Sequence, residues 1–238
     1  YRRAARHIVV SEYLAELLTR EGFYRTRITV VPPGRDLAPT GSPRSAADLR
    51  QGRAIALLCV SNWMRNKAIE HLLAALSRLP LETATLHLVG DDRADPAYAR
   101  ELRRLIARDG LRGRVIVHGS LDQETLAGLY RGADAFVLPS LREAYGAVCA
   151  EAMTAGLPVI ASRTDNLPYL VRDGVDGILV NPGDVAGLAG AVSALARDPA
   201  QRRRLGASGR ERALTFPTWE DSAGRFFAVL HEAAGAHS

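Results

Sequence analysis

Lysine is almost absent from this sequence, and cysteine is scarce. Lys67 is the only lysine among 238 residues, and there are two cysteines. Cys59 and Cys149 lie in apolar segments and do not form a C-x-x-C pair, so neither a disulfide framework nor a cysteine-based zinc site is expected. We expect both to be buried thiols of a protein that works in a reducing compartment.

Long apolar runs and several catalytic motifs are also missing. No run of eighteen apolar residues occurs, which argues against a membrane-spanning helix. The sequence has no G-x-S-x-G nucleophile elbow, no G-x-G-x-x-G dinucleotide loop, and no His, Cys and Asp cluster with metal-ligand spacing. Hydrolase chemistry built on that elbow and dinucleotide binding are therefore disfavoured, and no metal ligand is predicted.

The positive charge comes almost entirely from arginine. The chain carries 31 basic and 26 acidic residues, a formal net charge of +5. Runs such as 202–204 fall on predicted helices that also carry acidic residues, and no aromatic residues interleave with them. Solvated helix faces explain this pattern better than nucleic-acid binding does, so no nucleic-acid partner is expected.

Apolar, strand-like segments alternate with helical ones along the chain. Strands are expected at 6–10, 28–31, 54–60, 84–89, 115–118, 135–138, 159–161 and 177–180. Helices are expected at 12–21, 67–79, 97–109, 125–132, 146–155, 185–197, 200–215 and 218–233. This alternation predicts an α/β fold, a doubly wound, Rossmann-like parallel sheet that binds ligands beyond the carboxyl ends of its strands.

The segment 139–162 is the most informative, because it carries Glu143 and Glu151 with seven residues between them. Residues 146–155 are expected to form a helix that Gly156 ends. That helix is apolar on nearly every side, so it should be buried, and Glu151 should be a buried carboxylate. Such a group needs a partner, which sugar hydroxyls could supply. The alternative is structural: Glu143 as a helix cap and Glu151 paired to a buried arginine.

A second candidate site lies in the loop 61–68, which follows a predicted strand and opens a helix. This loop contains Arg65 and Lys67. Cations at a helix N-terminus oppose the helix dipole, but they are tolerated where a diphosphate lies between them and the backbone N–H groups. The loop therefore predicts an anion site, and the alternative is a surface Lys67 turned to solvent.

The pattern Pro-Ser-x-x-Glu-x-Tyr-Gly-x-x-x-x-Glu-Ala-Met over residues 139–153 resembles the retaining glycosyltransferases of family 4. These are the GT-B enzymes marked by a Glu, seven residues and a second Glu. The similarity continues to residue 162, with Thr154 where that family usually has alanine. It implies that Glu143 contacts the donor sugar and that Glu151 holds the nucleotide ribose.

The same resemblance assigns the phosphate site. In the family, an Arg and a Lys of a Gly-Arg-x-x-x-x-Lys-Gly loop hold the donor diphosphate. Lys67 matches that Lys, whereas Asn62 stands where the Arg is common, so Arg65 is the candidate replacement. Glu143, Lys67 and Arg65 are thus the implied catalytic residues. The implied donor-binding residues are Asn62, Ala144, Tyr145, Gly146, Val148, Glu151, His118, Ser120 and Leu121. Packing is the alternative role for Tyr145, and local pairing at a strand end is the alternative for His118.

The resemblance also covers the ends of the chain. It implies that residues 1–35 are the tail of an N-terminal, acceptor-binding domain. Residues 36–52, which are rich in proline, glycine and serine, are expected to be a linker. Residues 53–217 would be the donor-binding, Rossmann-like domain. Residues 218–238 would form a C-terminal helix that packs back toward the first domain. The chain is therefore expected to be the carboxyl half of a GT-B enzyme, and inactive without the missing N-terminal domain.

The implied function is transfer of a hexose from a UDP- or GDP-linked sugar to an unidentified acceptor (a glycan, a lipid or a small molecule), with retention of configuration. No cofactor and no metal are expected, and the location is expected to be cytoplasmic or peripheral to the inner membrane face. Two alternatives remain: a non-catalytic nucleotide-sugar-binding module and a GT-B-like nucleotide-sugar epimerase. A glycosidase is disfavoured, because its two carboxyls must flank one bond.

Overall fold

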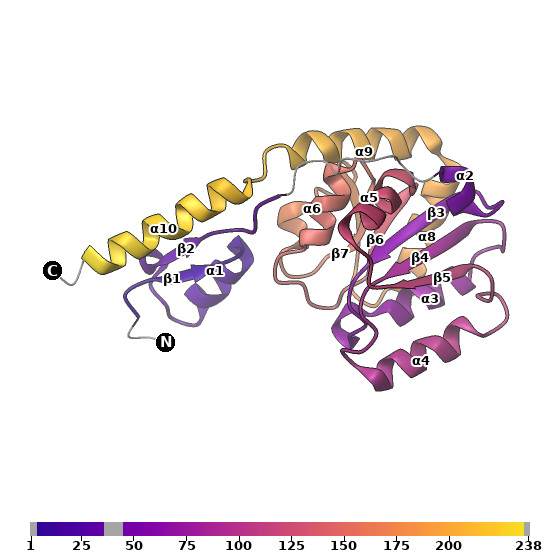
Figure 1. Ribbon diagram of the computed structural model, residues 1–238, viewed down its shortest axis with the longest axis horizontal. Coiled ribbons are helices and arrows are strands. Elements are labelled where there is room, and N and C mark those ends of the chain that lie inside the picture. The colour runs from indigo at the N-terminus through magenta and orange to yellow at the C-terminus, as the bar shows by residue number, and fades with distance from the viewer. Residues whose placement is uncertain (1–3, 36–44, 236–238) are drawn as a thin grey trace.

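A six-stranded parallel sheet forms the centre of the chain in a computed structural model that describes residues 4–35 and 45–235 (Figure 1). The strands are β3 (Ile55–Val60), β4 (Ala84–Val89), β5 (Val115–Gly119), β6 (Ala135–Leu138), β7 (Val159–Ser162) and β8 (Gly177–Val180). Their order is β5-β4-β3-β6-β7-β8, and every neighbouring pair is parallel. This arrangement confirms the predicted doubly wound α/β fold. The strand order reverses between β3 and β6, which is where such sheets bind ligands.

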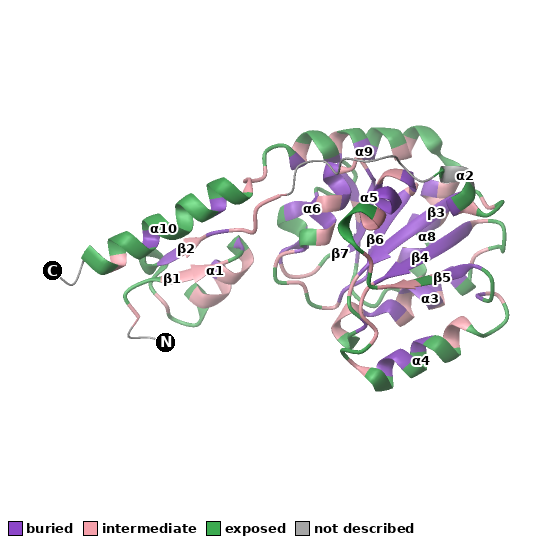
Figure 2. Cartoon of the chain, in the orientation of Figure 1, coloured by how far each residue is buried: buried purple, intermediate pink, exposed green. Residues whose placement is uncertain are grey.

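Helices cover both faces of this sheet. They are α2 (Ala46–Arg50), α3 (Ile69–Ser77), α4 (Pro96–Ile106), α5 (Gln123–Gly132), α6 (Ala147–Thr154), α7 (Leu167–Leu170), α8 (Val185–Arg197) and α9 (Pro199–Ala213). Alternate residues of β3 point to opposite faces: Leu57 belongs to the core against α3, α4 and α8, and Leu58 to the core against α5 and α6. Both leucines are fully buried, as are their neighbours on the strand (Figure 2). Two such cores explain the continuous apolar strands of the sequence.

A smaller unit lies beside the C-terminal helix. It consists of β1 (His7–Val9), α1 (Glu12–Arg20), a 3-10 turn (Arg25–Arg27) and β2 (Ile28–Val30), and the two strands are parallel. Helix α10 (Trp219–Gly235) runs along it (Figure 1). The Ser222 hydroxyl donates to the Pro32 carbonyl at 2.8 Å, and Arg6 pairs with Glu232 at 3.2 Å. The C-terminal helix therefore packs against the segment 4–35.

The helix boundaries follow their capping residues. Ser11 accepts from the Leu14 N–H at the start of α1, and Asp122 accepts from the Thr125 N–H at the start of α5. Gly156 adopts a left-handed φ of +80° just after α6. These ends agree with the predictions. Both cysteines are free and buried, and burial raises the pKa of the Cys59 thiol to about 12.

Three local features differ from the predictions. The expected linker 36–52 contains α2, because Leu49 packs into the core; residues 36–44 lie outside the described part of the chain. The helix expected at 67–79 begins instead as a 3-10 turn (Arg65–Lys67), since Ala68 takes a left-handed φ of +49° and interrupts it. Helix α7 was not predicted, because four residues are too few to show a helical period. Among the described residues, no helix is long and apolar enough to cross a membrane.

Candidate functional site

The loops that follow β3 and β6 meet at the carboxyl edge of the sheet. The Leu141 N–H, after β6, donates to the Asn66 carbonyl, after β3, at 2.8 Å. This bond joins the loops that follow the two strands between which the strand order reverses. The predicted cationic loop and the first glutamate of the pair are therefore brought to one place.

Lys67 and Glu143 form a close ion pair at this point. The Lys67 Nζ donates to the Glu143 Oε2 at 2.7 Å, and the two side chains keep only 21% and 12% of their exposure. A charge-assisted bond in a partly buried place is stronger and less screened than a surface pair. The alternative in which Lys67 is turned to solvent is therefore wrong.

The loop after β7 holds the backbone around Glu143. The Asp165 Oδ2 accepts from the Glu143 N–H at 2.8 Å, and the Asn166 N–H donates to the Glu143 carbonyl at 3.2 Å. The Asn166 side chain also donates to the Tyr145 carbonyl at 2.9 Å. Sequence reasoning missed both residues of this loop. The signal was two short polar side chains in the loop that follows a predicted strand of an α/β sheet.

Gly146 is the N-cap of α6, and its backbone needs glycine. Its φ is +95°, and a Cβ built there would lie 2.8 Å from Leu167 Cδ2 and 3.0 Å from Leu170 Cδ1. The N-terminus of α6 offers backbone N–H groups and a positive dipole end to an anion. Ala144 and Ala147 beside it are exposed, so a ligand can approach.

Glu151 is half-buried, so the prediction of a buried carboxylate is wrong in degree. The reason is that α6 is exposed at its start and borders a cavity of about 130 Å³, which Glu151 shares with Trp219. The Tyr130 hydroxyl donates to the Glu151 Oε2 at 2.9 Å, and also lies 3.4 Å from the Val148 carbonyl. Burial and the Glu151 carboxylate raise the pKa of Tyr130 well above its ordinary value. Sequence reasoning missed Tyr130, because the contact spans two helices.

Arg65 lies with α4 and not with the Lys67–Glu143 pair. Its guanidinium pairs with Glu101 at 2.7 Å and lies 5.3 Å from the centre of the Tyr98 ring. The Glu101 carboxylate raises the pKa of Arg65. Asn62 is exposed, and its Oδ1 accepts from the Asp91 N–H at 3.2 Å. The structure thus brings Lys67 into contact with Glu143 and leaves Arg65 occupied elsewhere.

His118 pairs with His87 on the neighbouring strand. The His87 Nδ1 and the His118 Nε2 are 2.9 Å apart, and the His87 Nε2 lies 2.9 Å from the Leu49 carbonyl. A carbonyl only accepts, so a neutral His87 carries its proton on Nε2 and accepts from His118. Local pairing, the alternative for His118, is therefore present. Ser120 and Leu121 follow β5 at the same edge, exposed and half-buried respectively.

Tyr145 also has a packing partner. Its hydroxyl lies 3.4 Å from the Pro33 carbonyl, and burial raises its pKa. The side chain therefore contacts the segment that leads out of β2, which is the packing role given above as its alternative. In the described ranges, no group of three or more His, Cys, Asp and Glu residues is arranged to hold a metal ion.

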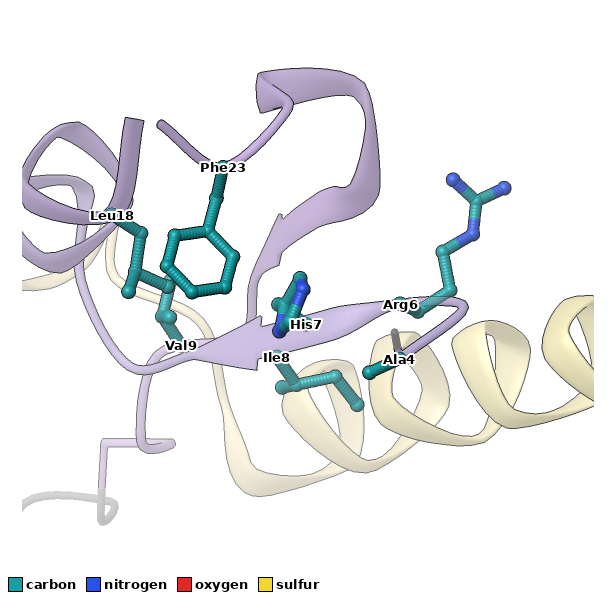
Figure 3. A pocket seen from close by; sticks show the side chains of 7 residues that line it. All are labelled: Ala4, Arg6, His7, Ile8, Val9, Leu18 and Phe23. Atoms are coloured by element: carbon teal, nitrogen blue, oxygen red, sulfur yellow. The ribbon is translucent and has the colours of Figure 1, made fainter. Parts of the chain in front are cut away.

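A second hollow lies on the small N-terminal unit, away from Glu143. It has a volume of about 470 Å³ and mainly apolar walls, including Ile8, Val9, Leu18 and Phe23 (Figure 3). The His7 ring meets Phe23 edge-on, with ring centres 4.9 Å apart. Its walls include no carboxylate or lysine, unlike the edge of the large sheet.

Comparisons with known proteins agree on one family. The profile of the family described as "Glycosyl transferases group 1" matches residues 54–198. A D-inositol 3-phosphate glycosyltransferase of Xylanimonas cellulosilytica is 34% identical in an alignment of 232 residues that covers 93% of this chain and 55% of that protein. An MMP alpha-(1->4)-mannosyltransferase of Mycolicibacterium hassiacum is 34% identical in an alignment of 232 residues that covers 94% of this chain and 56% of that protein. The chain therefore spans about half the length of the curated relatives it matches.

Solved structures show the same fold. A sucrose-phosphate synthase from Thermosynechococcus elongatus matches with a TM-score of 0.84 and 32% identity, over 96% of this chain and 58% of that one. HepE of Anabaena, in complex with UDP and glucose, matches with a TM-score of 0.86 and 26% identity, over 96% of this chain and 64% of that one.

Proposed function

Since this chain belongs to the group 1 glycosyl transferases, the GT-B enzymes of family 4, we propose that it binds the donor of a retaining hexosyltransferase. The donor would be a nucleotide-diphosphate sugar, and the acceptor would bind to a further domain. The observation that carries this proposal is the largely buried Lys67–Glu143 pair at the reversal of the strand order. We take the cation of this pair as the group that would bind phosphate, and the carboxylate as the group that would bind sugar hydroxyls.

Lys67 has enough donors for two partners. An ammonium group carries three N–H donors, so one can stay on Glu143 while another meets a phosphate oxygen. When the bond between sugar and phosphate breaks, negative charge develops on the diphosphate. A cation already in place stabilises that charge without reorganisation. The N-terminus of α6 at Gly146 adds its positive dipole end, so this charge is offset without a metal or cofactor.

Glu143 and Glu151 would bind different parts of the donor. Glu143, beside Lys67, would accept from hydroxyls of the sugar. Glu151 lies about one turn into α6, partly exposed, with its Oε2 accepting from the Tyr130 hydroxyl, and its carboxylate would accept from ribose hydroxyls. This geometry supports the roles implied by the resemblance. We assign Asn62, Ser120 and Leu121 to the rim of the same site, and give Arg65 no direct role.

The segments of the chain would belong to different domains of such an enzyme. Residues 1–35 would belong to an acceptor-binding domain, 53–217 to the donor-binding domain and 218–238 to the helix that rejoins the first. The packing of α10 against the segment 4–35 supports this division. The buried thiols Cys59 and Cys149 fit work in the reducing cytoplasm.

The first test is donor binding by the chain itself. Isothermal titration with UDP-glucose and with GDP- and ADP-linked sugars should find one donor that binds with equal affinity with and without EDTA. Transfer to a panel of acceptors should need a further, acceptor-binding domain. Lys67→Ala should weaken donor binding by about ten- to a hundredfold, and Arg65→Ala, in the same loop but paired with Glu101, is the matched control. Binding that requires a divalent metal would contradict the charge argument, and robust transfer by the chain alone would contradict the division into halves.

A further inference from the structure

Asp165 occupies an unusual backbone position directly beside the site. It lies between β7 and α7 with a left-handed φ of +46°, although it is not a glycine. Its side chain keeps only 10% of its exposure. A non-glycine residue in this conformation costs free energy and persists only where its contacts compensate. The contacts of the Asp165 carboxylate therefore indicate the role of this strained backbone conformation.

Those contacts converge on the Arg142 side chain and on the backbone of Glu143, the residue proposed to bind the sugar. The Asp165 Oδ2 accepts from the Glu143 N–H at 2.8 Å and from the Arg142 Nε at 3.1 Å. The flanking residues add two bonds to the same loop, because Thr164 Oγ1 donates to the Leu141 carbonyl at 3.0 Å and the Asn166 N–H donates to the Glu143 carbonyl at 3.2 Å. Glu143 is thus held at both its N–H and its C=O from one neighbouring loop.

We propose that Asp165 is a positioning residue, whose carboxylate fixes the backbone of Glu143 so that its side chain meets both Lys67 and the donor sugar. This inference rests on the proposed function, since it gives Glu143 its role toward the sugar. Lys67 alone cannot hold Glu143 in place, because its flexible side chain contacts one carboxylate oxygen of Glu143 and leaves the Glu143 backbone free to move. Two backbone bonds from the loop 164–166 remove that freedom. A preorganised carboxylate then binds the sugar without a cost of ordering.

The same carboxylate also meets the small N-terminal unit. The Tyr13 hydroxyl of α1 is near enough to Asp165 to lower the pKa of that carboxyl, and Tyr169 of α7 donates to the Glu16 Oε1 of α1 at 2.6 Å. The loop that holds Glu143 is therefore itself held by α1. Tyr13→Phe, which removes one hydroxyl and keeps the ring, should change sugar binding in the same direction as the loss of Asp165, but less.

The test separates the sugar from the nucleotide. The full chain is titrated with UDP and with UDP-glucose. The dissociation constant of UDP divided by that of UDP-glucose measures what the sugar contributes to affinity. Asp165→Ala should lower that ratio by about tenfold, the value of one lost charge-assisted bond, while the affinity for UDP stays within about twofold of wild type. Asp165→Asn keeps a carbonyl oxygen for the Glu143 N–H and should restore most of the ratio. Asp165→Gly relieves the backbone strain, so it should fold well and still behave like Asp165→Ala.

A second readout needs no ligand. Amide hydrogen exchange at Glu143 should be faster in Asp165→Ala and Asp165→Gly than in wild type. Unchanged exchange at Glu143, or equal losses for UDP and UDP-glucose, would overturn the positioning role. A wild-type chain that binds UDP-glucose no better than UDP would instead contradict the proposed function, and the exchange measurement would then decide the positioning of Glu143 by itself.

Discussion

Lys67 and Glu143 are 76 residues apart in the sequence, yet the Lys67 Nζ lies 2.7 Å from the Glu143 Oε2. The pair bridges the loops after β3 and β6, the two strands between which the order of the sheet reverses. Because both side chains are largely buried, removal of either leaves the other as a poorly solvated charge. The pair therefore links the predicted phosphate site to the predicted sugar site in one contact.

Lys67→Ala should weaken binding of a nucleoside diphosphate far more than binding of the nucleoside. A charge-assisted bond contributes roughly 1.5–3 kcal/mol, so the loss for the diphosphate should be about ten- to a hundredfold. Titration with UDP and with uridine measures both. Arg65→Ala serves as the control, since Arg65 pairs with Glu101 on α4. Equal losses for uridine and UDP would remove the phosphate assignment of Lys67.

Glu151→Gln should reduce discrimination between ribonucleotides and their 2′-deoxy or 3′-deoxy analogues. A carboxylate that accepts from ribose hydroxyls has nothing to accept when they are absent. Tyr130→Phe removes the donor 2.9 Å from the Glu151 Oε2 and keeps the buried ring, so it should reduce discrimination less. Competition binding with paired analogues measures the effect. If Glu151→Gln discriminates as well as wild type, the role of Glu151 is structural.

The stabilising effect of Asp165 should depend on pH. Burial alone would raise the pKa of Asp165, but hydrogen bonds from the Glu143 N–H, Tyr13 and Arg142 outweigh it and hold the pKa below its ordinary value of 3.8. A carboxyl with a lowered pKa in the folded state stabilises the fold above its unfolded pKa, and this stabilisation is lost as the pH falls through the folded pKa. Asp165→Asn should therefore lower the free energy of unfolding at pH values above 3.8, and by progressively less below that value.

Urea denaturation of wild type and Asp165→Asn across this pH range measures the difference. A difference that stays constant with pH would show that the charge of Asp165 does not contribute to stability.

Gly146→Ala should destabilise the chain and weaken donor binding. The new Cβ would lie 2.8 Å from Leu167 Cδ2 on a backbone with φ of +95°, so the Leu167 side chain must shift and the backbone of the new residue is strained. The expected cost is about 1–3 kcal/mol, read from thermal or urea denaturation. Gly190→Ala is the matched control: it lies exposed in α8 with open space around the new Cβ, and should stabilise by about 0.4–1 kcal/mol. Equal effects at both positions would argue against the special role of Gly146.

The chain by itself should associate weakly with itself. Helix α10 exposes four large apolar side chains although its other side packs on the segment 4–35. They are Trp219, Phe226, Phe227 and Leu230. Exposed apolar area of this kind favours association. Sedimentation velocity at increasing concentration should show a rising average mass, which Phe227→Ser lowers. A monomer at every concentration would contradict the prediction.

Local sequence was enough to place most elements of the large sheet. The strands predicted at 84–89 and 135–138 occur at β4 and β6 with the same bounds, because a short apolar run between turn residues has few other conformations. Helix caps were predictable because they too depend on residues close in the sequence. Asp122, for example, accepts from the Thr125 N–H in the first turn of α5. The helices that were missed, α2 and α7, have five and four residues, too few for a helical period.

The composition, the order of strands and helices, and the spacing of Glu143 and Glu151 were set by residues that are neighbours in the chain, so the sequence alone determined the fold class and the family pattern. Tertiary structure alone decided that Lys67 meets Glu143, that Arg65 is drawn to Glu101, and that Glu151 remains half-buried beside Tyr130. It also brought the Asp165 carboxylate into hydrogen-bond contact with the Glu143 N–H. The physical reason is that such contacts depend on which strands lie side by side and in which register. That arrangement comes from the packing of the whole sheet, which no local pattern of residues encodes.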